Sequence, residues 1–406
     1  MAHEPAVAHE PAVAHEPAVA HEPAVAHEPA VAHEPAVAHE PAVAAGIASV
    51  DDLRRLARAR LPGPVWDYVT GGAGEERTVR ANRDAFRRLT LLPRVLVDVA
   101  ARDPRTTVLG TGVAAPVGIA PTSYQSLAHP DGELATARAA GSRGLLDVVS
   151  VFSSVSLEDV AEVATGPLWF QLYCLRDRGV TRELVQRAAA AGYRALVLGV
   201  DLPVIGYRDR DIRNRFQLPP SVAPVNLPTR VAPGGSVLVE LNRALVDPAL
   251  TWRDVEWIRE ISPLPVVVKG IVAADDADRA ARIGADAVLV SNHGGRQLDG
   301  APASITALPD VVSVVADRCE VYLDSGVRRG TDVLAAVARG ARMAFVGRPV
   351  MWGLAAGGAD GVRAALDLYL TELDLAMAVC GCPDVPSIGP HLLGPIDRPG
   401  DRPADR

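Results

Sequence analysis

From residue 116 onward, the chain alternates short runs of apolar residues with longer stretches in which apolar positions recur every three or four residues. The short runs are rich in Val, Ile and Leu, and their apolar residues do not alternate with polar ones. This pattern is typical of strands in a parallel sheet that is covered on both faces. It predicts eight strands, at 116–120, 145–150, 168–173, 195–200, 265–269, 287–291, 321–324 and 343–346.

The stretches between these strands have the period of amphipathic helices. The helices predicted there span 131–143, 157–164, 182–191, 254–261, 275–283, 305–316 and 331–339. Eight strands alternating with helices favour a closed (β/α)8 or TIM barrel of the α/β class over a doubly wound sheet. No Gly-x-Gly-x-x-Gly motif follows the first strand, which counts against a dinucleotide-binding fold. Ahead of the barrel, 50–60 and 64–88 are predicted to form a helical extension with Pro and Gly punctuation at Pro62, Gly63, Gly71 and Gly72.

The N-terminal end of the chain has a different composition. Residues 2–43 are seven copies of the hexapeptide Ala-His-Glu-Pro-Ala-Val. A proline at every sixth position prevents a long helix, and Ala and Val supply too little apolar surface for a packed core. We therefore expect 1–45 to be a disordered arm, 46–390 to be one barrel domain, and 391–406 to be a flexible C-terminal tail. The repeated histidines lack the geometry of a metal site, so no metal is expected.

Charge and cysteine content narrow the class of protein. Outside the repeats the chain carries 41 basic and 42 acidic residues, and a neutral body argues against a nucleic-acid partner. No run of 18 apolar residues is present, so no membrane-spanning helix is expected. The four cysteines form neither a disulfide framework nor a Cys-x-x-Cys motif. A reduced, cytoplasmic enzyme fits these features best.

Polar residues follow the predicted strands, at the end of the barrel where active sites of this fold lie. They are Thr122, Ser123, Ser150, Gln171, Tyr173, Asp201, Lys269, Ser291, Asn292, His293, Arg296, Asp324, Ser325, Arg328 and Arg348. Lys269 is the single lysine of the chain, although arginine is abundant. Its place at the end of a strand makes it a candidate for a task that needs a compact ammonium group.

Two clusters among these residues point to specific chemistry. Gly326 to Arg328 and Gly347-Arg348 follow the last two strands, where such barrels commonly bind phosphate. Glycine backbone and guanidinium groups suit a phosphate dianion. His293 and Arg296 share one glycine-rich loop, which puts a base that titrates near neutral pH beside a group that matches a carboxylate. Asp201 would orient the imidazole. Together they predict cofactor-assisted oxidation of a carboxylic acid.

The run Ser-Asn-His-Gly-Gly-Arg-Gln-Leu-Asp at 291–299 resembles the signature of the FMN-dependent L-2-hydroxy acid oxidases and dehydrogenases. Glycolate oxidase, lactate oxidase and mandelate dehydrogenase belong to that family. Further matches lie at 61–68, 119–122, 170–173, 200–201, 268–270, 323–330 and 347–349. The resemblance runs from about Val50 to Cys382 and leaves out the repeats. It implies oxidation of an L-2-hydroxy acid to the 2-oxo acid, with FMN as cofactor and O2 as electron acceptor.

The resemblance also implies a role for each matching residue. Arg296, Arg208 and Tyr68 would hold the substrate carboxylate, and Tyr173 would contact its hydroxyl. His293 would accept a proton, paired with Asp201, while Lys269 would stabilise the reduced flavin ring. The FMN would be held by Thr122, Ser150, Gln171, Ser291, Asp324, Arg328, Gly347 and Arg348. A homo-oligomer, such as a tetramer, is expected, with no membrane partner.

Four positions depart from the family's pattern: Gly199 replaces a threonine, Ser123 a smaller residue, Phe152 a tryptophan and Ser325 a glycine. They surround flavin and substrate, and together with the sequences at 153–158 and 349–352 they favour a bulky or aromatic substrate side chain. Three alternatives stay open. The chain could be a quinone- or carrier-linked dehydrogenase, a flavin oxidase of a biosynthetic pathway with an unusual substrate, or an inactive barrel that serves as a scaffold.

Overall fold

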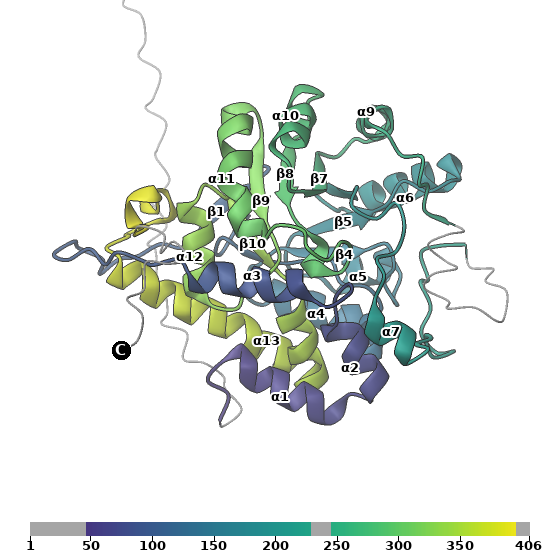
Figure 1. Cartoon of the computed structure of the whole chain (residues 1–406), viewed down its shortest axis with the longest axis horizontal. Coiled ribbons are helices and arrows are strands. Elements are labelled where there is room, and N and C mark those ends of the chain that lie inside the picture. Colours follow the sequence, from purple (N-terminus) through teal and green to yellow (C-terminus); the bar gives the residue numbers. More distant parts are fainter. Residues whose placement is uncertain (1–45, 229–244, 395–406) are drawn as a thin grey trace, which may run out of the picture. The chain divides into compact units, whose positions relative to one another are not determined.

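The structure is a computed structural model in which residues 46–228 and 245–394 are described. Eight parallel strands close into a barrel in the order β10-β3-β4-β5-β6-β7-β8-β9 (Figure 1). The predicted (β/α)8 barrel is thereby confirmed, and each of its strands overlaps a predicted one. They are β3 Val117–Ile119, β4 Asp147–Ser150, β5 Leu168–Leu172, β6 Leu196–Gly199, β7 Val266–Ile271, β8 Ala287–Val290, β9 Glu320–Leu323 and β10 Met343–Val346.

The strands are continuous apolar runs because both of their faces are buried. Residues that point into the barrel form one cluster, and those that point outward join a larger cluster under the helices. Three aromatic rings fill the barrel interior. Trp169 lies 5.4 Å from Tyr322 and 6.0 Å from Phe345 between ring centroids. The interior is therefore a packed core, and the chemistry is confined to the rim.

Helices cover the outside of the barrel, as Figure 1 shows. The seven predicted between the strands are confirmed, with ends shifted by up to four residues. The helix that follows β10, α13 Arg348–Val379, was not predicted; it changes direction at Gly357 and Gly358. It packs against α1, α4 and α12. The helices around the barrel are α4 Gly132–Gly141, α5 Leu157–Val163, α6 Arg178–Ala190, α9 Trp252–Ile261, α10 Ala274–Arg282, α11 Ser304–Val315, α12 Gly330–Ala338 and α13, with a short α7 Asp209–Arg213 after β6.

The helical extension consists of α1 Val50–Arg60, α2 Gly63–Thr70 and α3 Arg77–Arg87. The segment predicted to be helical over 64–88 is divided at the predicted Gly71-Gly72 punctuation, where residues 71–76 form a loop between α2 and α3. The loop is pressed against the signature run of the barrel. A Cβ atom on Gly72 would lie 2.8 Å from the carbonyl oxygen of Gly295, and Ala73 N donates to the same oxygen over 2.9 Å. The extension thus contacts the rim of the barrel directly.

A hairpin and the C-terminal residues complete the fold. The antiparallel strands β1 Thr106–Val108 and β2 Thr111–Val113 were not predicted, and Val108 and Val113 pack with the barrel interior. Of the predicted flexible tail, residues 391–394 are packed: Leu392 is buried, and Leu393 pairs with Leu91. The rest of that tail and the predicted disordered arm lie outside the described residues. None of the described helices is long and apolar enough to cross a membrane.

Candidate active site

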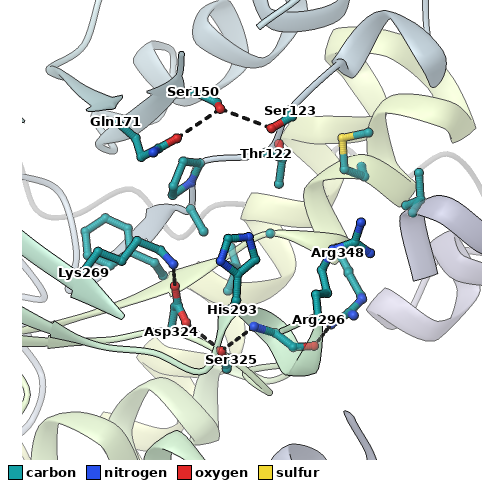
Figure 2. A pocket seen from close by; sticks show the side chains of 18 of the residues that line it. Thr122, Ser123, Ser150, Gln171, Lys269, His293, Arg296, Asp324, Ser325 and Arg348 are labelled. Carbon is teal, nitrogen blue, oxygen red and sulfur yellow. Dashed lines mark hydrogen bonds and ion pairs between the residues drawn. The ribbon is translucent and has the colours of Figure 1, made fainter. Parts of the chain in front are cut away.

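A cavity opens at the carboxyl ends of the strands. Figure 2 shows polar side chains that line it, and these come from the ends of β3, β4, β5, β7, β8, β9 and β10. Nearly all of the predicted site residues line it: Tyr68, Thr122, Ser150, Gln171, Tyr173, Arg208, Lys269, His293, Arg296, Asp324, Arg328, Gly347 and Arg348. Asp201 and Ser291 do not line the cavity but lie directly behind residues that do. No cluster of three or more metal-ligating side chains occurs in the described parts of the chain.

His293 and Asp201 form the pair that the sequence predicted. His293 Nδ1 lies 3.1 Å from both carboxylate oxygens of Asp201. Burial raises the pKa of Asp201, but His293 and Lys269 outweigh it and lower that pKa to about 2. Because Asp201 is ionised, Nδ1 of His293 carries the hydrogen and Nε2 keeps its lone pair. Burial lowers the pKa of His293 below its ordinary value, although Asp201 opposes that effect. The imidazole is therefore neutral at physiological pH.

Lys269 lies at the centre of a buried charge cluster. Its Nζ donates to Ser291 Oγ over 2.9 Å, and lies 3.3 Å from Asp324 Oδ2 and 3.9 Å from Asp201 Oδ2. Burial alone lowers the pKa of Lys269, but Asp324 and Asp201 raise it above its ordinary value. The lysine is therefore a fixed ammonium group. Ser291 supports it from behind, and its Oγ also accepts from His293 N over 3.1 Å.

The two arginines predicted to bind a carboxylate stand next to Tyr68. Arg296 Nη1 donates to the carbonyl oxygens of Tyr68 and Gly71, over 2.7 and 3.0 Å, and its guanidinium lies 5.1 Å from the Tyr68 ring centroid. Arg208 Nε donates to the Arg296 carbonyl over 3.3 Å. Burial and the nearby Arg296 lower the pKa of Arg208 to about 10. Both arginines are therefore cations held in place by backbone carbonyls.

Neutral hydroxyl and amide groups line the opposite side of the cavity. Ser150 Oγ donates to Gln171 Oε1 over 3.1 Å and lies 3.2 Å from Ser123 Oγ. Thr122 Oγ1 accepts from Gln125 Nε2 over 3.0 Å. Figure 2 shows Thr122, Ser123, Ser150 and Gln171 together, facing Lys269 and His293. These groups can donate or accept hydrogen bonds, and none of them carries a charge.

The predicted phosphate region lies after β9 and β10. Gly326 has a φ of 98°, and a Cβ there would lie 2.5 Å from the Asn82 carbonyl oxygen, so only glycine suits this turn. The Arg328 guanidinium lies 5.2 Å from the centroid of the Trp352 ring. Arg348 donates to the carbonyl oxygens of Gly294 and Gly71, over 2.9 and 2.8 Å. Two cations thus flank a glycine turn, as the spacing predicted.

Sequence reasoning did not identify Asn82, and it assigned no role to three other residues that hold the signature loop. Asn82 and Asn292 exchange a reciprocal pair of amide hydrogen bonds of 2.9 and 2.7 Å. Gln297 Nε2 donates to the carbonyl oxygens of Asp201 and Val204. Ser325, at a φ of 77°, accepts from Gly294 N and donates to Asp324. The resemblance noted Ser325 only as a departure, although its hydroxyl ties two loops together.

Unpaired donors test whether a flavin mononucleotide suits this cavity. Gln171 Nε2, Arg328 Nε and Arg348 Nε are buried, line the cavity and have no hydrogen-bond partner among the described residues. All three are donors, and FMN offers acceptors in its ring and its phosphate. Buried polar groups without a partner are rare in folded proteins. The donor set therefore fits FMN, with the amide near the neutral side and the arginines near the phosphate region.

Comparisons with known proteins agree with this geometry. The model of the FMN-dependent dehydrogenase family matches residues 57–395. The chain is 50% identical over 352 residues to L-lactate oxidase from Nostoc sp., which covers 84% of this chain and 96% of the relative. It is 44% identical to glycolate oxidase 1 from Oryza sativa subsp. indica, over 87% of this chain and 97% of the relative.

Solved structures point the same way. A crystal structure of mandelate oxidase is 45% identical, with a TM-score of 0.81, and the match covers 86% of this chain and 98% of that one. A second, described as mandelate oxidase with (S)-4-hydroxymandelic acid, has a TM-score of 0.82 at 45% identity with the same coverage. FMN is therefore the cofactor. The chain belongs to the FMN-dependent dehydrogenase family and, within it, to the 2-hydroxy acid oxidases.

Proposed function

We propose that this enzyme oxidises an L-2-hydroxy acid with a bulky or aromatic side chain to the 2-oxo acid. O2 is the electron acceptor and is reduced to H2O2. The observation that carries the proposal is the 3.1 Å contact of His293 with Asp201, in the same cavity as Arg296, Arg208 and Tyr68. This set combines a neutral base with two cations that line the same cavity.

Arg296 and Arg208 are proposed to bind the substrate carboxylate. Arg296 Nη1 is engaged by two backbone carbonyls, which fixes the guanidinium plane and leaves its remaining N–H groups for a planar anion. Arg208 is 8% exposed and stays charged at neutral pH. Tyr68 stacks on Phe216 with 4.7 Å between centroids, which holds its ring against Arg296. The carboxylate would thus be held between the two guanidinium groups, beside the Tyr68 ring.

His293 is proposed to accept the proton that leaves the substrate. Its Nδ1–H donates to ionised Asp201, so Nε2 is the free acceptor. When Nε2 takes the proton, the imidazolium is stabilised by the carboxylate behind it. Tyr173 lines the same cavity with its ring near Asp201 and would donate to the substrate hydroxyl. The two groups would thus act at the alcohol group of the substrate, Tyr173 at its oxygen and His293 on the proton that leaves.

FMN, when bound, accepts the two electrons of the substrate and passes them to O2. We propose that it is held by the residues named above as its contacts, with Ser291 acting through Lys269 and not by direct contact. Lys269 would place its compact ammonium group against the ring, where Asp324 and Asp201 fix it. A cation at that place favours the ring that carries the extra electrons.

The shape of the cavity supports a large substrate side chain. Its apolar lining includes Phe152, Leu202, Ile205 and Met351. Phe152 contacts the Tyr173 ring at 5.7 Å between centroids. Aromatic and branched side chains bury apolar substrate surface, which favours a bulky or aromatic group over the single hydrogen of glycolate.

Anaerobic reduction tests this function. The oxidised holoenzyme is mixed without oxygen with L-lactate, L-mandelate, L-2-hydroxyisocaproate and glycolate, and flavin bleaching is followed. Air is then readmitted, and H2O2 is measured. We expect fastest bleaching with L-mandelate and rapid reoxidation by O2. Reoxidation only by a quinone or a protein carrier would make the enzyme a dehydrogenase, and no bleaching by any hydroxy acid would contradict the proposed reaction.

We further propose that the enzyme assembles into a homo-oligomer. Large apolar side chains are exposed between α3 and β1 and on the last turns of α13. Leu96 is fully exposed, Val95 is 80% exposed, and Leu375 and Val379 are more than half exposed. Exposed apolar groups of this size commonly lie in interfaces. Sedimentation equilibrium of the holoenzyme should give a mass several times that of the chain, and replacing Val95 and Leu96 by Ser and Asp should lower it. A monomeric wild-type enzyme would contradict the assembly.

A further inference from the structure

A third tyrosine, Tyr124, lines the cavity beside Tyr68 and Tyr173. Only 3% of it is exposed. Its hydroxyl forms no hydrogen bond with the described residues, and it is not one of their fully enclosed unpaired atoms, so it is open to the cavity. Neither the proposed carboxylate clamp nor the proton transfer uses this phenol. It can therefore form a hydrogen bond with a ligand in the cavity.

The backbone holds Tyr124 in an unusual conformation. Its φ and ψ are 57° and 48°, in the left-handed region that non-glycine residues seldom adopt. Tyr124 N donates to the Phe152 carbonyl over 3.1 Å, and Leu127 N donates to the Tyr124 carbonyl over 3.0 Å. Backbone strain of this kind persists where surrounding contacts enforce it, and it concentrates at ligand sites. The loop after β3 is thus shaped to keep this side chain at the cavity wall.

The ring of Tyr124 joins the apolar side of the cavity. It lies 6.1 Å from the Phe152 ring centroid, and Phe152 lies 5.7 Å from Tyr173. Burial, together with the neighbouring phenols of Tyr68 and Tyr173, raises the pKa of Tyr124 above its ordinary value. The hydroxyl is therefore protonated at neutral pH. It can donate a hydrogen bond to an acceptor and accept one from a donor.

We propose that Tyr124 determines specificity by hydrogen bonding an oxygen atom on the substrate's side chain, away from the reacting carbon. This inference rests on the proposed function and deepens it: the substrate class becomes an L-2-hydroxy acid whose aromatic side chain carries a hydroxyl group. Phe152 and the Tyr124 ring contact the aromatic face, and the Tyr124 hydroxyl pairs with the substituent. A site with a buried polar group prefers the substrate that satisfies that group over the one that leaves it unpaired.

Substitution of Tyr124→Phe removes the hydroxyl and keeps the ring. The probes are (S)-mandelate and (S)-4-hydroxymandelate, which differ by one oxygen. We expect kcat/KM for (S)-4-hydroxymandelate to fall about 3- to 10-fold, the scale of one neutral hydrogen bond, while kcat/KM for (S)-mandelate changes little. The matched control is Tyr207→Phe, because Tyr207 is 72% exposed and does not line the cavity. Tyr124→Leu, which also removes the ring, should lower kcat/KM for both substrates.

Binding without turnover gives a second readout. The products benzoylformate and 4-hydroxybenzoylformate are titrated into oxidised holoenzyme, and their Kd values are taken from the change in the flavin spectrum. Tyr124→Phe should weaken only 4-hydroxybenzoylformate. An equal loss for both ligands, or no loss for either, overturns the role of Tyr124. Failure of every hydroxy acid to reduce the wild-type flavin would instead overturn the proposed function, so the two failures are distinguishable.

Discussion

Along β6 to β9 the rim of the barrel carries ionised groups, whereas along β3 to β5 it carries neutral ones. The charged half consists of Asp201, Lys269 and Asp324 around the neutral base His293, with contacts of 3.9 Å or less. The neutral half consists of Thr122, Ser123, Ser150, Gln171 and Tyr173. Figure 2 shows members of the two halves on opposite sides of the cavity.

The two halves differ in whether their polar groups already have hydrogen-bond or ion-pair partners within the protein. Burying an isolated charge costs several kcal/mol, so the charged half pairs its groups internally and is fixed before a ligand enters. In the neutral half, Gln171 Nε2 is left without a partner among the described residues. This difference agrees with the proposed roles, in which the charged half transfers the proton and offsets charge on the cofactor. The neutral half then forms hydrogen bonds to ligands and selects the substrate.

The largest effect is expected from His293→Gln, in the charged half. Glutamine keeps a polar side chain but cannot accept the proton. Flavin reduction should slow by at least about 100-fold, the scale of positioned proton transfer, while FMN stays bound. Stopped-flow reduction and the flavin content of the purified protein check this. Near-normal reduction would show that another group is the base.

Arg296→Lys should have the next largest effect. Lysine keeps the charge but loses the planar pair of N–H donors that suits a carboxylate. We expect kcat/KM to fall roughly 10- to 100-fold, the scale of a lost hydrogen bond to a charged group, with a raised KM and normal FMN content. Unchanged KM would place the carboxylate elsewhere.

Lys269→Arg tests the cation beside the flavin. The wider guanidinium does not fit between Asp324, Asp201 and Ser291, where the lysine is 5% exposed. We expect lower FMN content or a lower flavin midpoint potential, with substrate affinity less affected. If Lys269→Arg lowers only substrate affinity and Arg296→Lys lowers flavin content, Lys269 does not lie at the flavin and Arg296 does not lie at the substrate carboxylate.

Much of the fold and the site was predictable because both depend on local sequence. Each barrel strand is a continuous apolar run, and each strand end carries its polar residue next to it in the chain. Topology alone then brings Asp201, Lys269 and His293 together, although they are separated by up to 92 residues. The FMN family was recognisable from the signature run for the same reason.

Contacts between distant backbone segments could not be predicted in this way. The Gly71-Gly72 pair marks the break between α2 and α3, but no local periodicity indicates the close approach of Gly72 to Gly295. α13 has a Pro in its first turn and contains a Gly-Gly pair, so its pattern does not indicate one helix. Tyr124 resembles any aromatic loop residue until its φ of 57° and its place in the cavity are known. Such features arise from tertiary packing, and the periodicity of the sequence does not reveal them.

The pH dependence of reduction should separate the two halves further. Protonation removes the lone pair of His293, and burial holds its pKa below the ordinary value of 6.5. kcat/KM should therefore be flat near neutrality and fall about tenfold per pH unit only once the pH drops below that lowered pKa. Asp201→Asn removes the carboxylate that raises this pKa, so its acid limb should move to lower pH. An acid limb above pH 6.5 in the wild type would contradict a neutral, buried His293.

Gly199→Ala should have the smallest effect, and it acts where the two halves meet. Gly199 ends β6 and pairs with Lys269, while a Cβ at this position would lie 2.5 Å from Cε1 of the Tyr173 ring. Its φ is not in the left-handed region, so alanine meets a steric problem and not a backbone one. The ring must move into the cavity, which should lower kcat/KM about 3- to 10-fold, the scale of mild overpacking, and more for mandelate than for glycolate.

Gly63→Ala is the matched control, because a Cβ at Gly63 meets no atom within 4 Å. A double-mutant cycle with Tyr173→Ala decides the cause: the penalty of Gly199→Ala should vanish when the ring is gone, and a penalty that persists would place its effect on the strand itself.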